Sequence, residues 1–253
     1  MGTLDGKIAI VTGAGQGIGE GIALALAKEG AKIAAIGRTE AKLHDTCGQI
    51  EAFGGQAIPV VADVNDADDI QRTVATTVQT FGRLDILVNN AYGIAIGPLL
   101  TLTDADFERS MNGSALSTFR YMTACYPYLK ASGEGAILNL STSATRRWDA
   151  ANYGFYAASK RAVEALSRAA ASEWGVDNIR VNTIAPHALS PGLKGWIEAN
   201  PAEAKEFFKT IPLGRVGDCE TDIGAVALFL VGPASRYVTG TVIPVDGGQA
   251  FFG

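Results

Sequence analysis

The sequence has few of the residues that build disulfide frameworks and metal sites. Its three cysteines, Cys47, Cys125 and Cys219, lie far apart without a Cys-x-x-Cys pair, and its only histidines are His44 and His187. Scattered cysteines in an odd number argue against a disulfide framework or a zinc knuckle, and two histidines are too few for a His-rich metal site. We therefore expect no metal and reduced thiols, which fit a cytoplasmic protein.

Long apolar runs and clusters of basic residues are also missing. Apolar runs such as residues 225–231 are too short to cross a bilayer, and no run of Lys or Arg is longer than two. The net charge is −5 and the pI is about 5.1. Because nucleic-acid binding draws most of its affinity from clustered basic side chains, we expect neither a nucleic-acid partner nor a membrane partner.

The remaining composition is that of a globular α/β protein. The chain has 253 residues, of which 47% are hydrophobic and 30 are glycines, and this length is routine for one α/β domain. Short β-prone runs alternate with segments of helical periodicity, and no linker or repeat interrupts them. We expect strands at 7–12, 32–36, 57–62, 86–88, 136–140, 179–184 and 241–245, and helices at 18–28, 40–53, 68–81, 104–130, 152–174 and 220–230. This order predicts a single domain over residues 1–253 with a doubly wound parallel sheet.

A glycine-rich turn follows the first strand. Gly13, Gly17 and Gly19 fit the spacing G-x-x-x-G-x-G between a buried strand and a helix. Glycines let the backbone approach a pyrophosphate closely, and the amino end of the helix faces its charge. The turn therefore predicts a dinucleotide site.

The carboxyl ends of the next strands carry further polar residues. Where an acidic residue would hold the 2′-hydroxyl of NAD, the second strand ends in Gly37 and Arg38, which favours the 2′-phosphate of NADP. The alternative is that Arg38 is an ordinary solvent-exposed arginine with no role in cofactor binding. Asp63 follows the third strand, where it is placed to meet an adenine amino group. Asn89 and Asn90 follow the fourth, either as turn formers or as hydrogen-bond donors that fix this edge.

Two segments in the second half break the regular pattern. Gly113 is a poor helix former inside 104–130, and with Asn112 it predicts a local kink. Residues 187–215 have weak periodicity and contain one short amphipathic piece, 201–209. We interpret 187–215 as a lid that sets substrate specificity.

Tyr156 and Lys160 stand four residues apart on the expected helix 152–174, one turn above the other. A neighbouring ammonium favours the phenolate and brings the pKa of a tyrosine toward the working range of an acid–base catalyst. The same spacing also arises in ordinary surface pairs, so the pair alone does not decide between the two interpretations.

The motifs taken together resemble the single-domain short-chain dehydrogenases/reductases. They are, in order, Thr-Gly-Ala-Gly-Gln-Gly-Ile-Gly at 12–19, Asn-Asn-Ala at 89–91, Asn112, the Ser/Thr cluster at 141–143, Tyr-Ala-Ala-Ser-Lys at 156–160, Arg-Val-Asn at 180–182 through Pro186, and Val-Asp-Gly-Gly at 245–248. The resemblance covers nearly the whole chain. It implies a Rossmann fold of seven parallel strands that binds NADP (NAD possible), assembled as a homotetramer or homodimer through 104–130 and 152–174.

The resemblance also implies roles for individual residues. Tyr156 would be the general acid or base, Lys160 would lower its pKa and hold the nicotinamide ribose, and Asn112 would anchor a water of a proton relay. A hydroxyl after the fifth strand would orient the substrate oxygen. The distance from the strand indicates Thr142, whereas the family's usual spacing indicates Ser143; we favour Ser143 and keep Thr142 as the alternative. The implied cofactor-binding residues are Gly13, Gln16, Gly17, Ile18, Gly19, Arg38, Asp63, Val64, Asn90, Ala91, Tyr156, Lys160 and Pro186.

Three positions depart from the family pattern. Tyr92 stands where the family has glycine, His187 replaces the glycine of a Pro-Gly turn, and Pro191 replaces a threonine that meets the nicotinamide. His187 is either a packing residue or a contact for a polar substrate.

The resulting hypothesis is an oxidoreductase that transfers a hydride between NADP(H) and a small-molecule carbonyl or secondary alcohol. An alternative is a 3-oxoacyl-carrier-protein reductase, for which Arg146, Arg147 and Lys194 give a thin basic patch. A different class of function, a cofactor-binding sensor without turnover, is motivated by the altered turn at His187.

Overall fold

The computed structural model describes residues 2–147 and 151–252. In this part of the chain, seven parallel strands form one sheet in the order β3-β2-β1-β4-β5-β6-β7. The strands are β1 (Ile8–Thr12), β2 (Lys32–Gly37), β3 (Ala57–Val61), β4 (Ile86–Asn89), β5 (Gly135–Leu140), β6 (Ile179–Pro186) and β7 (Val242–Val245). The predicted α/β fold with a doubly wound parallel sheet is therefore confirmed.

Helices connect the strands. They are α1 (Gly17–Lys28), α2 (Glu40–Ala52), α3 (Ala67–Phe81), α4 (Asp104–Met111), α5 (Ser117–Ser132), α6 (Gly154–Trp174), α7 (Pro191–Ala199), α8 (Pro201–Lys209) and α9 (Ala225–Val231). Several ends follow from local chemistry: α3 begins where Asp66 accepts hydrogen bonds from the N–H groups of Asp68 and Asp69, and it ends at Gly82 with φ of 84°.

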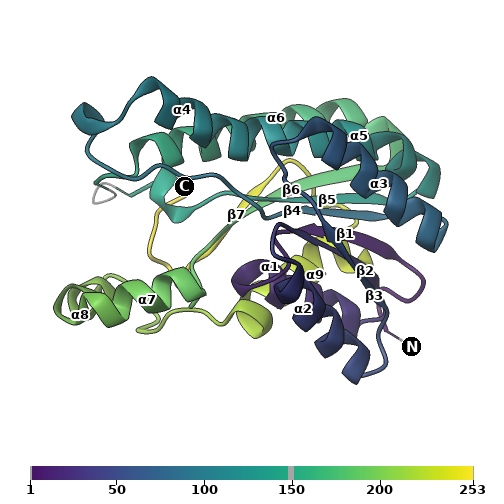
Figure 1. Cartoon of the computed structure of the whole chain (residues 1–253), viewed down its shortest axis with the longest axis horizontal. Coiled ribbons are helices and arrows are strands. Elements are labelled where there is room, and N and C mark those ends of the chain that lie inside the picture. Colours follow the sequence, from purple (N-terminus) through teal and green to yellow (C-terminus); the bar gives the residue numbers. More distant parts are fainter. Residues whose placement is uncertain (1, 148–150, 253) are drawn as a thin grey trace.

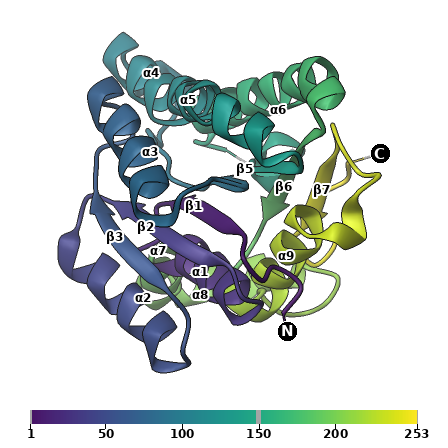
Figure 2. The same cartoon turned by 90° about the vertical axis from the view of Figure 1, so that its right-hand side faces the viewer.

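The two faces of the sheet are both buried, as parallel strands require. Successive side chains of a strand point to opposite faces. Ala9 and Val11 of β1 accordingly join the core under α1, α2 and α9, and Ile10 joins the core under α3, α5 and α6. Figures 1 and 2 show these two helical layers on either side of the sheet.

The order of the strands reverses at β1 and β4, which lie side by side in the sheet although β2 and β3 come between them in the sequence. In such sheets the crevice beyond the carboxyl ends of the strands is the usual ligand site. In Figure 1, α7 and α8 extend below this end of the sheet and α4 lies above it. The fold thus brings the turns after β1, β4, β5 and β6 to one edge.

Three local features differ from the predicted pattern. The segment 104–130 is two α-helices joined by η2 (Asn112–Leu116), a π-helical segment, so the predicted irregularity at Asn112 and Gly113 is confirmed while a single α-helix was wrong. The helix α6 begins two residues later than expected, at Gly154. The lid contains α8 at the predicted residues and a helix that was not predicted, α7, which begins with Pro191 after the N-cap Ser190.

No helix in the described residues is long and apolar enough to cross a membrane.

Candidate functional site

The turn between β1 and α1 requires glycine at three positions. Gly13 and Gly17 have φ of 67° and 61°, which side chains rarely adopt. A Cβ on Gly19 would lie 2.2 Å from the Gly13 carbonyl oxygen. The backbone therefore comes to the surface here without side chains in front of it.

Thr12 and Asn90 attach this turn to the end of β4. The Asn90 side chain donates to the carbonyl oxygens of Thr12 and Gly13 at 2.9 and 3.2 Å, and the N–H groups of Asn90 and Ala91 donate to the Thr12 hydroxyl at 3.0 Å each. The hydrogen bonds expected of Asn90 are confirmed. Thr12 was not predicted as a functional residue, although a hydroxyl at the last position of a buried strand is a signal that the sequence offers.

The amino end of α1 fits a diphosphate. Gln16 at the N-cap makes no side-chain hydrogen bond to the helix, and the first N–H groups of a helix have no intrahelical acceptor. They are available to an anion, with the helix dipole adding attraction. Ile18 packs against the core and anchors the first turn. The open glycine turn and the uncapped helix together form a place that the diphosphate of NAD(P) fits.

Two cationic side chains stand at the end of β2 beside this turn. Arg38 directly follows the strand and is exposed. Lys42, also exposed, donates a hydrogen bond to Gln16 Oε1. A Cβ on Gly15 would lie 3.0 Å from Lys42 Cβ, so the first turn of α2 lies against the glycine turn. Lys42 was missed from the sequence because its position became clear only from the packing of α2.

Asp63 and Val64, after β3, are already engaged with the protein. Asp63 Oδ1 accepts from the backbone and side-chain nitrogens of Asn65 at 2.9 and 2.8 Å, and the Asp63 N–H donates to Asp69. Val64 packs against the core under α3. Contact with an adenine therefore stays a prediction for both residues.

Tyr156 and Lys160 lie together on the first turns of α6. The Lys160 ammonium is 5.9 Å from the centre of the Tyr156 ring and 5.6 Å from that of Tyr92, and it donates to the Leu140 carbonyl oxygen at 2.8 Å. The Tyr92 and Tyr156 rings are 5.9 Å apart, and Tyr153 lies 6.2 Å from Tyr156 on another side. The pair is thus surrounded by aromatic rings rather than exposed as an ordinary surface pair.

Burial sets the protonation of both groups. Burial, and to a lesser extent the neighbouring Tyr92, raises the pKa of Tyr156, and the Thr142 hydroxyl opposes the rise. Burial lowers the pKa of Lys160 to about 8. The expected lowering of the Tyr156 pKa is therefore wrong for the chain by itself, because withdrawal from water disfavours the phenolate.

The three hydroxyls after β5 point to different partners. The Thr142 hydroxyl accepts the Ala144 N–H at 3.3 Å, and it lowers the pKa of the neighbouring Tyr156 phenol. Ser143 donates instead to Asp246 Oδ2 at 2.8 Å, and Ser141 donates to Glu164 Oε1 at 2.5 Å. Because the Ser143 hydroxyl is engaged by Asp246, this arrangement favours Thr142 over Ser143, and the choice between the two stays a prediction.

Asn112 makes no hydrogen bond with the lysine in the described structure. It is exposed, and the water relay expected there stays a prediction. Two residues later in η2, Ser114 is buried, and its hydroxyl donates to the Gly93 carbonyl oxygen at 3.3 Å. Sequence reasoning missed Ser114 because the π-helical segment changes which residues face inward.

The lid begins beside both parts of the site. Pro186 ends β6 in register with Val245, and a Cβ on Gly17 would lie 3.1 Å from Pro191 Cδ, so the start of α7 packs on the glycine turn.

His187 meets Phe207 of α8 edge to face at 5.2 Å, and both of its ring nitrogens are buried without a hydrogen-bond partner in the described residues. Burial lowers the pKa of His187, so the ring is neutral near pH 7.

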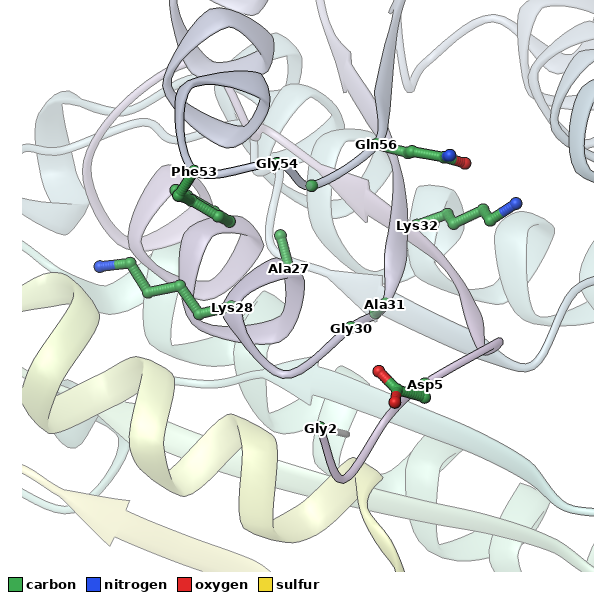
Figure 3. Close-up of a pocket in the computed structure, with 11 residues that line it drawn as sticks. Gly2, Asp5, Ala27, Lys28, Gly30, Ala31, Lys32, Phe53, Gly54 and Gln56 are labelled. Atoms are coloured by element: carbon green, nitrogen blue, oxygen red, sulfur yellow. The ribbon is translucent and has the colours of Figure 1, made fainter.

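A surface pocket of about 360 Å³ lies elsewhere, at the amino ends of β2 and β3. Figure 3 shows Lys28, Lys32, Phe53 and Gln56 around it, and it contains none of the predicted site residues. It is therefore separate from the chemistry described above. Within residues 2–147 and 151–252 no cluster of His, Cys, Asp and Glu side chains is arranged to hold a metal ion.

Known proteins with similar sequences and structures cover nearly the whole chain. A family model described as enoyl-(acyl carrier protein) reductase matches residues 13–250. A 12α-hydroxysteroid dehydrogenase of a Clostridium species is 39% identical over 98% of each chain, and the 3-oxoacyl-[acyl-carrier-protein] reductase FabG of Thermotoga maritima is 36% identical over 97% of this chain and 98% of its own. A 7α-hydroxysteroid dehydrogenase, solved in complex with NADH and 7-oxo glycochenodeoxycholic acid, has a TM-score of 0.92 at 35% identity, covering 98% of this chain and 95% of the other.

Proposed function

The chain belongs to the short-chain dehydrogenases/reductases and is an NAD(P)-dependent oxidoreductase, and on this premise we propose that it reduces a carbonyl substrate with NADPH, using Tyr156 as the general acid. The observation that carries the proposal is the position of the Tyr156 phenol, which has the Thr142 hydroxyl and the Lys160 ammonium as neighbours. In the oxidative direction the same phenol would act as the base.

The bound nicotinamide supplies the hydride, and the protein supplies position and the proton. Tyr156 donates its proton to the carbonyl oxygen, and the Thr142 hydroxyl donates a hydrogen bond to the same oxygen as negative charge develops there. Lys160 keeps its charge below its pKa of about 8 and stabilises the phenolate that Tyr156 becomes. Proton supply to this pair through Asn112 remains part of the proposal, and the buried Ser114 is a second polar group of the same segment.

NADP is the proposed cofactor, with NAD as the alternative. Arg38 and Lys42 place two positive charges at the end of β2, where the 2′-phosphate of NADP would lie, and Gly37 leaves room beside them. Gly13, Gly17, Gly19 and the amino end of α1 would hold the diphosphate.

The substrate is a small molecule with a carbonyl or secondary alcohol group. Two of the relatives act on hydroxysteroids by name, and FabG supports the alternative of a 3-oxoacyl-carrier-protein reductase. The basic patch that a carrier protein would need is weak, because Arg146 pairs with Glu164 and the Arg147 guanidinium lies 5.1 Å from the Phe207 ring. We favour a free ketone for this reason.

A sensor without turnover is disfavoured, since the relatives are enzymes and both Tyr156 and Lys160 are present.

We also propose a domain organisation, an oligomeric state and a cellular location for the protein. We take residues 1–253 as one cofactor-binding domain with a lid at 187–215. A homotetramer or homodimer is supported by a shallow apolar groove between η2, α5 and α6, lined by Met111, Ala115, Leu116, Phe119, Ala162, Ala165 and Leu166. The scattered cysteines support a cytoplasmic location.

Turnover of the purified protein tests the proposal. NADPH and NADH oxidation would be followed against cyclic ketones and 3-oxoacyl thioesters. We expect Tyr156→Phe to lower kcat by about 10²-fold or more, the usual contribution of general acid catalysis, while the Kd for NADPH stays unchanged. Equal turnover by the variant would refute the role of Tyr156, and tight NADPH binding without reduction of any carbonyl would favour the sensor.

A further inference from the structure

Tyr92 is held in place by the residues on either side of it. The Ala91 N–H donates to the Thr12 hydroxyl at 3.0 Å, and the Gly93 N–H donates to the Gly113 carbonyl oxygen at 2.9 Å. A Cβ on Gly113 would lie 2.5 Å from Gly93 Cα, so the loop after β4 and the π-helical segment are in direct backbone contact. This contact fixes where the Tyr92 side chain leaves the loop.

The fixed loop directs the Tyr92 ring to the lysine and the tyrosine of the site. The ring centre is 5.6 Å from the Lys160 ammonium and 5.9 Å from the Tyr156 ring. The ammonium is also 5.9 Å from the Tyr156 ring, so it lies within cation–π distance of two rings that come from different elements.

Lys160 has few other means of stabilising its charge in the chain alone. The residue is 3% exposed, and the hydrogen bond that its ammonium makes in the described structure goes to the Leu140 carbonyl oxygen. An ammonium has three donors, and withdrawal from water disfavours its charged form. The negative face of an aromatic ring offsets part of that cost.

We propose that Tyr92 is a positioning residue, whose ring holds the Lys160 ammonium charged and in place below Tyr156. The inference rests on the roles proposed above for Tyr156 and Lys160. Tyr92 also remains 55% exposed, so it borders the open side of the site where the resembled family has a glycine without a side chain.

Two substitutions of similar size separate the ring from the hydroxyl. Tyr92→Phe keeps the aromatic face, and Tyr92→Leu replaces it by an aliphatic group that still covers the ammonium. We expect kcat to stay within about twofold for Tyr92→Phe and to fall about 5- to 30-fold for Tyr92→Leu, the range of a desolvated cation–π contact. A fall of equal size in both variants, or unchanged kcat in Tyr92→Leu, would overturn the proposal.

An NMR titration of the Lys160 ε-methylene group, assigned from its loss in Lys160→Arg, gives a second readout that needs no turnover. In the described residues, the titratable groups that contact the ammonium are Tyr92 from the loop after β4 and Tyr156 from α6. We expect a lower Lys160 pKa in Tyr92→Leu than in the wild type and Tyr92→Phe, because the ring favours the charged form. An identical pKa in all three proteins would overturn the inference, whereas absence of carbonyl reduction by the wild type would count only against the proposed function.

Discussion

Ser143 donates its hydroxyl hydrogen bond to Asp246 at 2.8 Å, so a buried carboxylate more than a hundred positions later in the chain engages this hydroxyl. Thr142 has an extended backbone, with φ of −156° and ψ of 147°, and neighbouring side chains of an extended chain point to opposite sides. Ser141 and Ser143 accordingly share one side, where they bind the buried carboxylates of Glu164 and Asp246, and Thr142 points to the other side, where it lowers the pKa of Tyr156.

This alternation predicts opposite outcomes for two hydroxyl deletions. Thr142→Val keeps the shape of the side chain and removes a donor to the substrate oxygen, so we expect kcat/KM to fall by about 10²- to 10³-fold. Ser143→Ala leaves Asp246 short of a partner and should cost about 1–3 kcal/mol in the free energy of unfolding, with turnover nearly unchanged. Steady-state kinetics and urea unfolding measure the two effects. Loss of turnover in Ser143→Ala but not in Thr142→Val would reverse the assignment.

The cations at the end of β2 predict the choice of cofactor. Arg38→Ala and Lys42→Ala should each raise the Kd for NADPH about tenfold and leave the Kd for NADH nearly unchanged, because only NADPH carries the 2′-phosphate. Cofactor fluorescence titrations measure both constants. Arg236→Ala is the matched control, since Arg236 is an exposed arginine after β6 and α9, far along the chain from β2. Equal weakening of both cofactors would remove the basis for NADP.

The lowered pKa of Lys160 predicts a pH dependence of stability. In the folded chain its pKa is about 8, against 10.5 for the free side chain. Below pH 8 the ammonium is charged in both states and contributes no slope. Between pH 8 and pH 10.5 the Lys160 side chain is protonated in the unfolded chain and neutral in the folded chain. The free energy of unfolding therefore rises with pH, by up to about 1.4 kcal/mol per pH unit.

Lys160→Met isolates this contribution, because the other titrating groups are common to both proteins. We expect the wild type to gain stability relative to Lys160→Met as the pH rises from 8 to 10, measured by urea unfolding at each pH. A difference that does not change over this range would show that Lys160 titrates normally.

The sequence predicted the parts of the site that depend on local pattern. Gly13, Gly17 and Gly19 stand out by spacing, since their backbone conformations and close contacts exclude other residues. Tyr156 and Lys160 stand out because four residues make one helical turn. The parallel sheet followed from the alternation of apolar strands and amphipathic helices.

The parts that were missed depend on contacts between distant segments. The Ser143 hydroxyl is engaged by Asp246, which follows β7, and this contact, which favours Thr142 as the partner of Tyr156, could not be read from local spacing. Which residues of 112–116 face inward is decided by a π-helical segment packed on Gly93. The helix α7 was missed because Gly192 and Gly195 weaken its periodicity, although Ser190 caps it.

The contacts of the Glu164 carboxylate predict that the loop after β5 affects both stability and turnover. The residue is 8% exposed, and its carboxylate accepts hydrogen bonds from Ser141 at 2.5 Å and Arg161 at 3.1 Å and lies 3.4 Å from Arg146. Glu164→Gln keeps the shape but removes the charge that holds these partners. Solvent reaches both arginines, whose side chains are 28% and 44% exposed, so losing the ion pairs costs about 1 kcal/mol and we expect a slightly lower urea midpoint. We also expect kcat to fall about tenfold, because even a small displacement of Thr142 disturbs the alignment of the reacting groups.

Glu173→Gln on the exposed end of the same helix is the control and should change neither quantity. Wild-type kcat in Glu164→Gln would show that the loop keeps Thr142 in place without this carboxylate.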